Sequence, residues 1–138
     1  MNIEINSHNK ISEVRDDFNK LFPYLKLEFF SKPHVEGEGS WSKFMIFDHT
    51  KTLKEISDPP YIGSDILFFT PAMETGNFEQ LMQKNFGLSV QVFRKSMGAW
   101  IESIQSDNWT LEKQNNKGHE SADSVTEMIY TPRLEEES

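Results

Sequence analysis

The same pattern occurs twice in this chain, and this internal repeat limits the fold more than any other feature. Residues 14–30 and 77–94 each have the apolar spacing of an amphipathic helix, then a turn, then a strand of alternating side chains. Helix positions recur 64 residues later and strand positions 63 residues later. Such similarity indicates a duplicated unit. The matched pairs are Val14 and Phe78, Phe18 and Met82, Phe22 and Phe86, Leu25 and Leu88, Leu27 and Val90, Phe29 and Val92, and Phe30 and Phe93.

The segments around the repeat predict an α+β fold. An alternating segment at residues 2–6 precedes the first helix, and an apolar run at residues 65–70 precedes the second. A further strand is expected after each copy, at residues 42–48 and 99–106. Two β-α-β-β units then form one mixed, mainly antiparallel sheet. The right-handed crossover rule places both helices on one face of it, a broadly ferredoxin-like layering.

Two short segments predict local structure. The run DILFFT at residues 65–70 is continuously apolar, which is typical of a strand covered on both faces and central in its sheet. Thr52 and Glu55 have the Thr-x-x-Glu spacing of a capping box, which predicts one helical turn after Thr52.

Chain length and local composition define the expected domain. A chain of 138 residues suits one domain that buries its own core. We expect this domain at residues 1–117, with repeat one at 1–57, a hinge at 58–61 and repeat two at 62–117. Residues 118–138 are acidic and poor in apolar side chains, which is typical of a flexible tail.

Charge and composition exclude several classes of function. The formal net charge is -8, and most of it lies in the last residues of the chain, so the folded body is nearly balanced. Such a body lacks the basic field that attracts duplex nucleic acid. The absence of cysteine excludes disulfides, thiolate metal sites and cysteine nucleophiles. With no secretion signal and no apolar run near the roughly 20 residues of a membrane span, we expect a soluble cytoplasmic protein without a membrane partner.

Three segments carry a resemblance to other proteins. FPYLKLEFF at residues 22–30, FGLSVQVFRKS at 86–96 and NWTLEKQN at 108–115 resemble segments of small acidic proteins of the Bacteroidota, a group with no assigned function. The resemblance implies a domain that folds by itself. It carries over no catalytic or binding residues.

The outer face of the predicted sheet holds one candidate binding site. Phe30 and Phe93 occupy equivalent strand positions and are expected on the solvent side, with Arg94 and Lys95 next to Phe93. Aromatic side chains beside cations on an open sheet can stack the bases of single-stranded RNA. Cover by a loop, the tail or a second subunit is the alternative, and the acidic total charge favours it.

The tail holds a second candidate. Met128, Ile129 and Tyr130, with Leu134 close behind, form a short apolar segment between acidic residues. Such a segment can dock on another protein or add a strand to a sheet edge. It can equally fold back over the face that carries Phe30 and Phe93.

A metal site is the weaker possibility. His34, Glu36 and Glu38 lie in the predicted loop at residues 32–39, and Asp48 and His49 follow the next strand. Histidine and carboxylate ligands suit zinc and other divalent ions. The spacing matches no established site, and a solvated loop has the same composition.

No motif in the chain identifies a reaction. There is no nucleophile elbow, no P-loop and no G-x-G-x-x-G sequence. We therefore expect no catalytic residues and no cofactor, and a non-catalytic protein-binding or adaptor module that acts through the outer sheet face, the loop at residues 32–39 or the tail. The expected partner is another protein or, in a homodimer, a second copy of the chain. The alternative is a small-molecule or metal-binding protein centred on residues 32–39.

Overall fold

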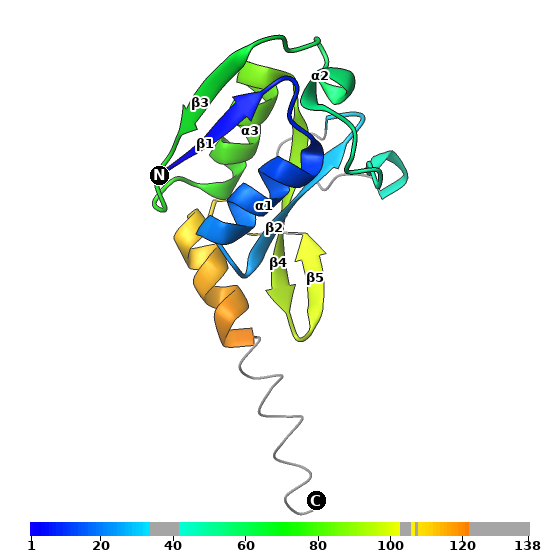
Figure 1. The fold of residues 1–138 in the computed structure, drawn as a ribbon. Helices are drawn as coiled ribbons and strands as arrows, with labels where there is room; N and C mark the ends of the chain where they lie inside the picture. The colour runs from blue at the N-terminus through cyan, green and yellow to red at the C-terminus, as the bar shows by residue number, and fades with distance from the viewer. Residues whose placement is uncertain (34–41, 103–105, 107, 122–138) are drawn as a thin grey trace, which may run out of the picture.

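A computed structural model of the chain describes residues 1–33, 42–102, 106 and 108–121 (Figure 1). The expected α+β class is confirmed. The elements are, in chain order, β1 (Asn2–Asn6), α1 (Ile11–Leu21), β2 (Leu25–Phe30), the 3-10 turn η1 (Ser42–Phe44), α2 (Leu53–Ile56), β3 (Ser64–Phe68), α3 (Thr75–Phe86), β4 (Ser89–Ser96), β5 (Ala99–Glu102) and a helix at residues 111–121.

The strands lie in two antiparallel sheets, whereas a single mixed sheet was expected. Within the described residues, β1 pairs with β3, and the second sheet has the order β2-β4-β5. Each sheet therefore joins a strand of one repeat to its counterpart in the other. On β2 and β4, Glu28 lies directly opposite Gln91, the residue that occupies its own position in the second repeat. The two repeats are therefore related by a pseudo-twofold axis that passes between these two residues.

Equivalent backbone contacts fix the start of each long helix. An isolated β-bridge forms just before α1, and a matching bridge forms just before α3. The first residue of each helix then donates its N–H to a carbonyl oxygen of the same facing segment at 2.9 Å. The bridges join Lys10 to Thr52 and Glu74 to Thr110, and the hydrogen bonds run from Ile11 to Lys51 and from Thr75 to Trp109.

One apolar core joins the helices to both sheets. α1 packs against β2 and α3 against β4 (Figure 1). The ring centroids of Phe18 and Phe78 lie 5.3 Å apart between the two helices. Both helices thus cover the same face of the three-stranded sheet, as predicted. Ile3 and Leu67 bring the two-stranded sheet into this core.

Residues 42–48 do not form the strand expected after the first copy. They contain η1 and a single isolated bridge between Phe30 and Met45. The reason lies at the edge of β2, where the side chains of Arg15 and Asn19 from α1 already bind two backbone carbonyl groups. A long strand cannot pair where those carbonyls are occupied.

The expectation that residues 65–70 are covered on both faces is wrong for half of the run. Leu67 and Phe69 are buried, but Ile66 is 49% exposed and Phe68 is 70% exposed. β3 is half of a two-stranded sheet, and only one face of that sheet packs on the core. A continuous apolar run therefore did not indicate a central strand here. The capping box at Thr52 and Glu55 is confirmed, and it starts α2.

The segment that follows each repeat packs on the other repeat. The helix at residues 111–121 continues beyond residue 117, and a Cβ on Gly118 would lie 2.9 Å from the Cβ of Tyr24. Gly87 holds the position equivalent to Tyr24 and has a φ of 65°, and a Cβ there would lie 2.6 Å from the carbonyl oxygen of Pro59. The two repeats are thereby interlocked.

Candidate binding surface on the three-stranded sheet

Four side chains on the outer face of the β2-β4-β5 sheet form the most distinctive surface in the described part of the chain. Lys26 on β2 lies opposite Phe93 on β4, and Lys95 on β4 lies opposite Trp100 on β5. All four are half-buried. We call Lys26, Phe93, Lys95 and Trp100 the aromatic–cation patch.

Both lysines of the patch lie over aromatic rings. The Lys26 Nζ is 5.5 Å from the ring centroid of Phe93 and 5.1 Å from that of Trp100. The Lys95 Nζ is 4.9 Å from the Trp100 centroid. Ammonium groups within about 6 Å of a ring centroid are attracted by its electron-rich face. The patch therefore presents apolar ring surface and positive charge within one small area.

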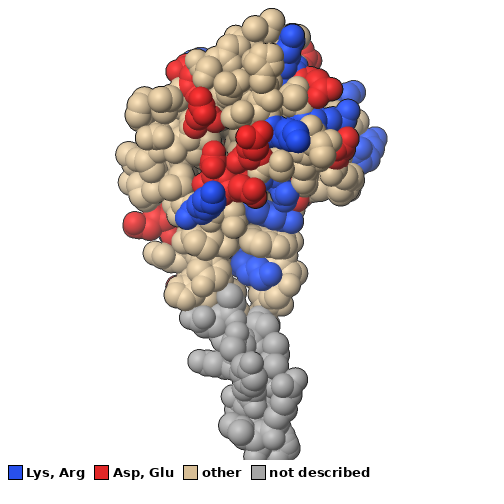
Figure 2. Space-filling view, in the orientation of Figure 1, with Lys and Arg blue, Asp and Glu red and all other residues tan. Residues whose placement is uncertain are grey.

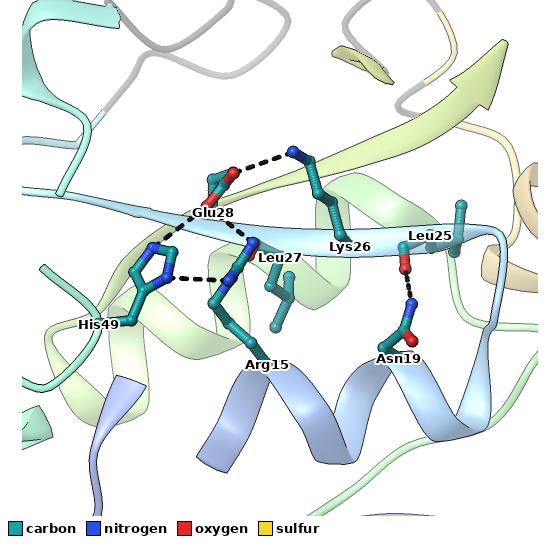
Figure 3. Close-up of polar contacts among 7 residues, drawn as sticks. All are labelled: Arg15, Asn19, Leu25, Lys26, Leu27, Glu28 and His49. Carbon is teal, nitrogen blue, oxygen red and sulfur yellow. Dashed lines mark hydrogen bonds and ion pairs between the residues drawn. The ribbon is translucent and has the colours of Figure 1, made fainter. Parts of the chain in front are cut away.

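Glu28 holds one side of the patch in place (Figure 3). Its Oε2 lies 3.1 Å from the Nζ of Lys26, and the carboxylate is largely buried. Its Oε1 lies 3.4 Å from Arg15 Nη2 and 3.7 Å from His49 Nε2, which is longer than an ordinary hydrogen bond. These surrounding groups offset the cost of removing the carboxylate from water.

The hydrogen bond between Arg15 and His49 determines the tautomer of the histidine. Arg15 Nη1 lies 2.9 Å from His49 Nδ1 (Figure 3). A guanidinium group can only donate, so Nδ1 must accept the hydrogen bond. The ring proton is then on Nε2, the atom that faces Glu28. The three side chains thus form one polar cluster with a defined direction of donation.

Side chains from α1 close the outer edge of β2. Arg15 Nε donates to the carbonyl oxygen of Leu27 at 2.9 Å, and Asn19 Nδ2 donates to that of Leu25, also at 2.9 Å (Figure 3). The two donors reach alternate carbonyls because one helical turn rises about 5.4 Å and two strand residues span about 6.6 Å. Charged side chains at an edge strand protect it from pairing with other chains.

The position equivalent to Arg15 in the second repeat holds a residue of opposite charge, and that residue also binds backbone. Glu79 on α3 corresponds to Arg15, and its Oε2 accepts a hydrogen bond from the backbone N–H of Val92 at 2.8 Å. In each repeat a long-helix side chain thus binds the backbone of the following strand. A cation binds a carbonyl in one repeat, and an anion binds an amide in the other.

A small pocket of about 310 Å³ adjoins the aromatic–cation patch. Lys26 and Trp100 form its wall on the sheet side, and Arg15, Asp16 and Asn19 of α1 form the other. Figure 2 shows acidic and basic side chains lying side by side over α1 rather than in large areas of one sign. The pocket therefore suits a small polar side chain beside an aromatic ring.

The structure brings together only part of the predicted sheet-face site. Phe93 and Lys95 belong to the patch. Phe30 is 2% exposed, so the expectation that it faces solvent is wrong. Arg94 alternates to the opposite side of β4, where its Cζ lies 5.6 Å from the ring centroid of Trp109. Neither Phe30 nor Arg94 can contribute to the patch.

Most of the remaining predicted site residues lie outside the part of the chain that the structure describes. These are His34, Glu36 and Glu38 of the loop and Met128, Ile129, Tyr130 and Leu134 of the tail. The hydroxyl and amide of Thr50 donate to the Asp48 carboxylate at 2.6 and 3.1 Å and lower its pKa. His49 instead faces Arg15 and Glu28. Among the residues that the structure describes, no three His, Asp or Glu side chains are grouped to hold a metal ion.

Sequence reasoning missed Lys26 and Trp100 as members of one site. Lys26 alternates with buried neighbours and is typical of a solvated strand position, and Trp100 is typical of a core rim. Only the register of β2, β4 and β5 places both beside Phe93. A lysine directly opposite an aromatic residue on the neighbouring strand would have indicated this site. These pairs can be recognised only when the strand register is known.

Comparison with protein-family models, curated proteins and solved structures finds no match to this chain. The candidate site is therefore described from the structure of this chain alone. It is a half-buried aromatic–cation patch on an α+β domain. The helices found within residues 1–33, 42–102, 106 and 108–121 include no candidate for a membrane-spanning segment.

Proposed function

We propose that this protein is a non-catalytic, cytoplasmic protein-binding module, and that its aromatic–cation patch binds an acidic segment of a partner protein. The observation that carries the proposal is the position of the Lys26 and Lys95 ammonium groups over the rings of Phe93 and Trp100. Carboxylates of a partner can pair with the ammonium groups while a neighbouring apolar side chain covers the rings. Aromatic side chains such as Phe93 and Trp100 are enriched at the centre of protein interfaces.

The patch is held in a fixed arrangement before any partner binds. All four of its side chains extend from paired strands, and the ion pair with Glu28 fixes Lys26. A preorganised site loses less conformational entropy on binding than a site on loops. This favours binding by the existing face of the sheet without a large rearrangement.

The test is selection of peptides from a displayed random library on the immobilised full chain. The proposal predicts enriched peptides that combine acidic residues with an apolar or aromatic residue. A synthetic copy of one such peptide is then titrated by fluorescence anisotropy. Its affinity is expected to fall about tenfold in Lys95→Glu and to weaken with added salt, because the contact is partly electrostatic. Lys84→Glu, an exposed lysine on α3, is the matched control and keeps the affinity.

Two results would contradict the proposal. Enriched peptides that bind Lys95→Glu as well as the unchanged protein would exclude the patch as the site. No enrichment over a blank surface, together with stoichiometric metal in the purified protein that is lost in His34→Ala, would replace peptide binding with a metal-binding function at residues 32–39.

A further inference from the structure

We infer that the chain's own C-terminal segment, residues 122–138, occupies the aromatic–cation patch when no partner is bound. This inference rests on the proposed function, since it assigns a second, internal ligand to the same surface. Position, length and charge each support it independently.

The described part of the chain ends at the end of the sheet that carries the patch, on the side of Arg94, because a Cβ on Gly118 would lie 3.5 Å from the Arg94 Cγ. Gly118 packs against Tyr24, and the ring of His119 stacks on the ring of Tyr24 at a centroid distance of 4.7 Å. Tyr24 immediately precedes β2, and its carbonyl oxygen accepts the N–H of Lys95 at 3.0 Å. The helix at residues 111–121 thus delivers the following segment to the end of the sheet that carries Lys26 and Lys95.

The segment is long enough to reach the outer face. Met128 follows Ser121 by seven residues, which span up to roughly 23 Å when extended. Lys26 follows Tyr24 by two residues, so it lies roughly 7 Å further along the strand. The apolar group of Met128, Ile129 and Tyr130 can therefore cross the end of the sheet and still lie over the patch.

The segment also matches the patch in chemistry. Residues 122–138 contain five acidic residues and one arginine, which gives a net charge of -4. The apolar group lies between Glu127 on one side and three consecutive glutamates on the other. Acidic side chains can pair with Lys26 and Lys95 while Tyr130 or Ile129 covers the rings. This is the chemistry proposed above for the partner.

A tethered ligand has a consequence for partner binding. A short linker keeps the segment near the patch at an effective concentration on the order of 1 mM, so even a weak contact is occupied much of the time. A partner must then displace it. The segment would act as an internal competitor that sets a threshold for partner affinity.

The experiment uses the full chain with one spin label. The protein has no cysteine, so Thr131→Cys provides a unique attachment site for a nitroxide. Amide signals of Lys26, Phe93 and Lys95 and the indole signal of Trp100 are expected to broaden strongly. Signals of Ile66 and Phe68 on the outer face of β3 are expected to broaden little. The broadening should disappear in Lys95→Glu and persist in Lys84→Glu.

Several outcomes would overturn the inference. Broadening that is spread evenly over the surface, or that is strongest on β3, would exclude docking at the patch. Broadening that also appears when a spin-labelled ¹⁴N chain is mixed with an unlabelled ¹⁵N chain would mean that the segment binds a second copy. Broadening that is unchanged in Lys95→Glu would remove the electrostatic part of the argument.

The peptide selected above separates the two proposals. In a full chain with Met128, Ile129 and Tyr130 all changed to serine, its affinity is expected to rise at least about tenfold. An unchanged affinity without broadening leaves the patch as a partner site but rejects the internal ligand. Broadening in a chain that binds no selected peptide, even after the three serine changes, rejects the partner function and retains the internal contact.

Discussion

Arg15 donates a hydrogen bond from its Nε to the carbonyl oxygen of Leu27 at 2.9 Å, and this contact closes the edge of β2 while the same guanidinium meets Glu28. We expect Arg15→Ala to lower the free energy of unfolding by about 1–3 kcal/mol, because it leaves a carbonyl and a largely buried carboxylate with fewer partners. Equilibrium unfolding in urea measures the effect. Lys20→Ala, an exposed change on the same helix, is the control and should change stability by less than about 0.5 kcal/mol. Equal losses in both variants would contradict the role of Arg15.

The Arg15 contact also predicts the tautomer of His49. Because Nδ1 accepts from Arg15, the neutral ring should carry its proton on Nε2. The ¹⁵N chemical shifts of the ring report this directly, with Nε2 showing the protonated value and Nδ1 the unprotonated value. In Arg15→Ala the ring should exchange between tautomers. An Nδ1–H tautomer in the unchanged protein would show that the hydrogen bond is absent.

Gly118 allows the C-terminal helix to approach Tyr24. Alanine in place of glycine inside a helix normally stabilises the helix by about 1 kcal/mol. Here its Cβ would lie 2.9 Å from the Tyr24 Cβ and 3.0 Å from the Tyr24 carbonyl oxygen, so the helix must shift. We expect Gly118→Ala to destabilise the protein by about 1–2 kcal/mol and to remove the nuclear Overhauser contacts between His119 and Tyr24. Lys117→Ala is the control, and a stabilised Gly118→Ala variant would contradict the close packing.

The capping box of α2 predicts a pH effect. Hydrogen bonds from the backbone N–H and the hydroxyl of Thr52 hold the pKa of Glu55 below its usual range. A carboxyl group with a lowered folded-state pKa stabilises the fold above its unfolded-state pKa, and this contribution is lost as pH falls through the folded-state pKa. Thr52→Ala should raise the pKa of Glu55 only in part, since the backbone N–H still donates. Carboxyl ¹³C titration measures both values, and a normal pKa in the unchanged protein would refute the contact.

The two faces of β3 should respond differently to substitution. Leu67 is buried, so Leu67→Ala should cost about 2–3 kcal/mol of unfolding free energy. Phe68 is 70% exposed, and Phe68→Ser should cost less than about 1 kcal/mol. Urea unfolding at two protein concentrations tests both variants. A large, concentration-dependent cost for Phe68→Ser would mean that a second copy of the chain covers this face.

Periodicity predicted the helices and most strands because each long helix and each paired strand buries one side. It could not predict which strands pair. Residues 42–48 have a strand-like pattern, but Arg15 and Asn19 occupy the β2 carbonyls that such a strand would need. The alternation of apolar residues does not show that helix side chains bind the carbonyls at a strand edge in place of another strand.

The candidate site shows the same limit. Alternation correctly placed Phe30 and Phe93 on one side of their strands, but burial depends on what lies above each position. Phe30 is covered and Phe93 is half-exposed. Lys26 and Trp100 join Phe93 through cross-strand register, which depends on the lengths of the connecting turns and is not contained in any one strand.

Glu28 and Gln91 face each other on the pseudo-twofold axis, and both are buried. If one repeat formed a symmetric pair with an identical copy, this position would face itself, and two glutamates there would repel. The two repeats of a single chain are free of that restriction, because they can carry different residues at this position. One half keeps the carboxylate that orients Lys26, and the other carries an uncharged amide. A buried carboxylate is thus present at a point where exact symmetry would bring two like charges together.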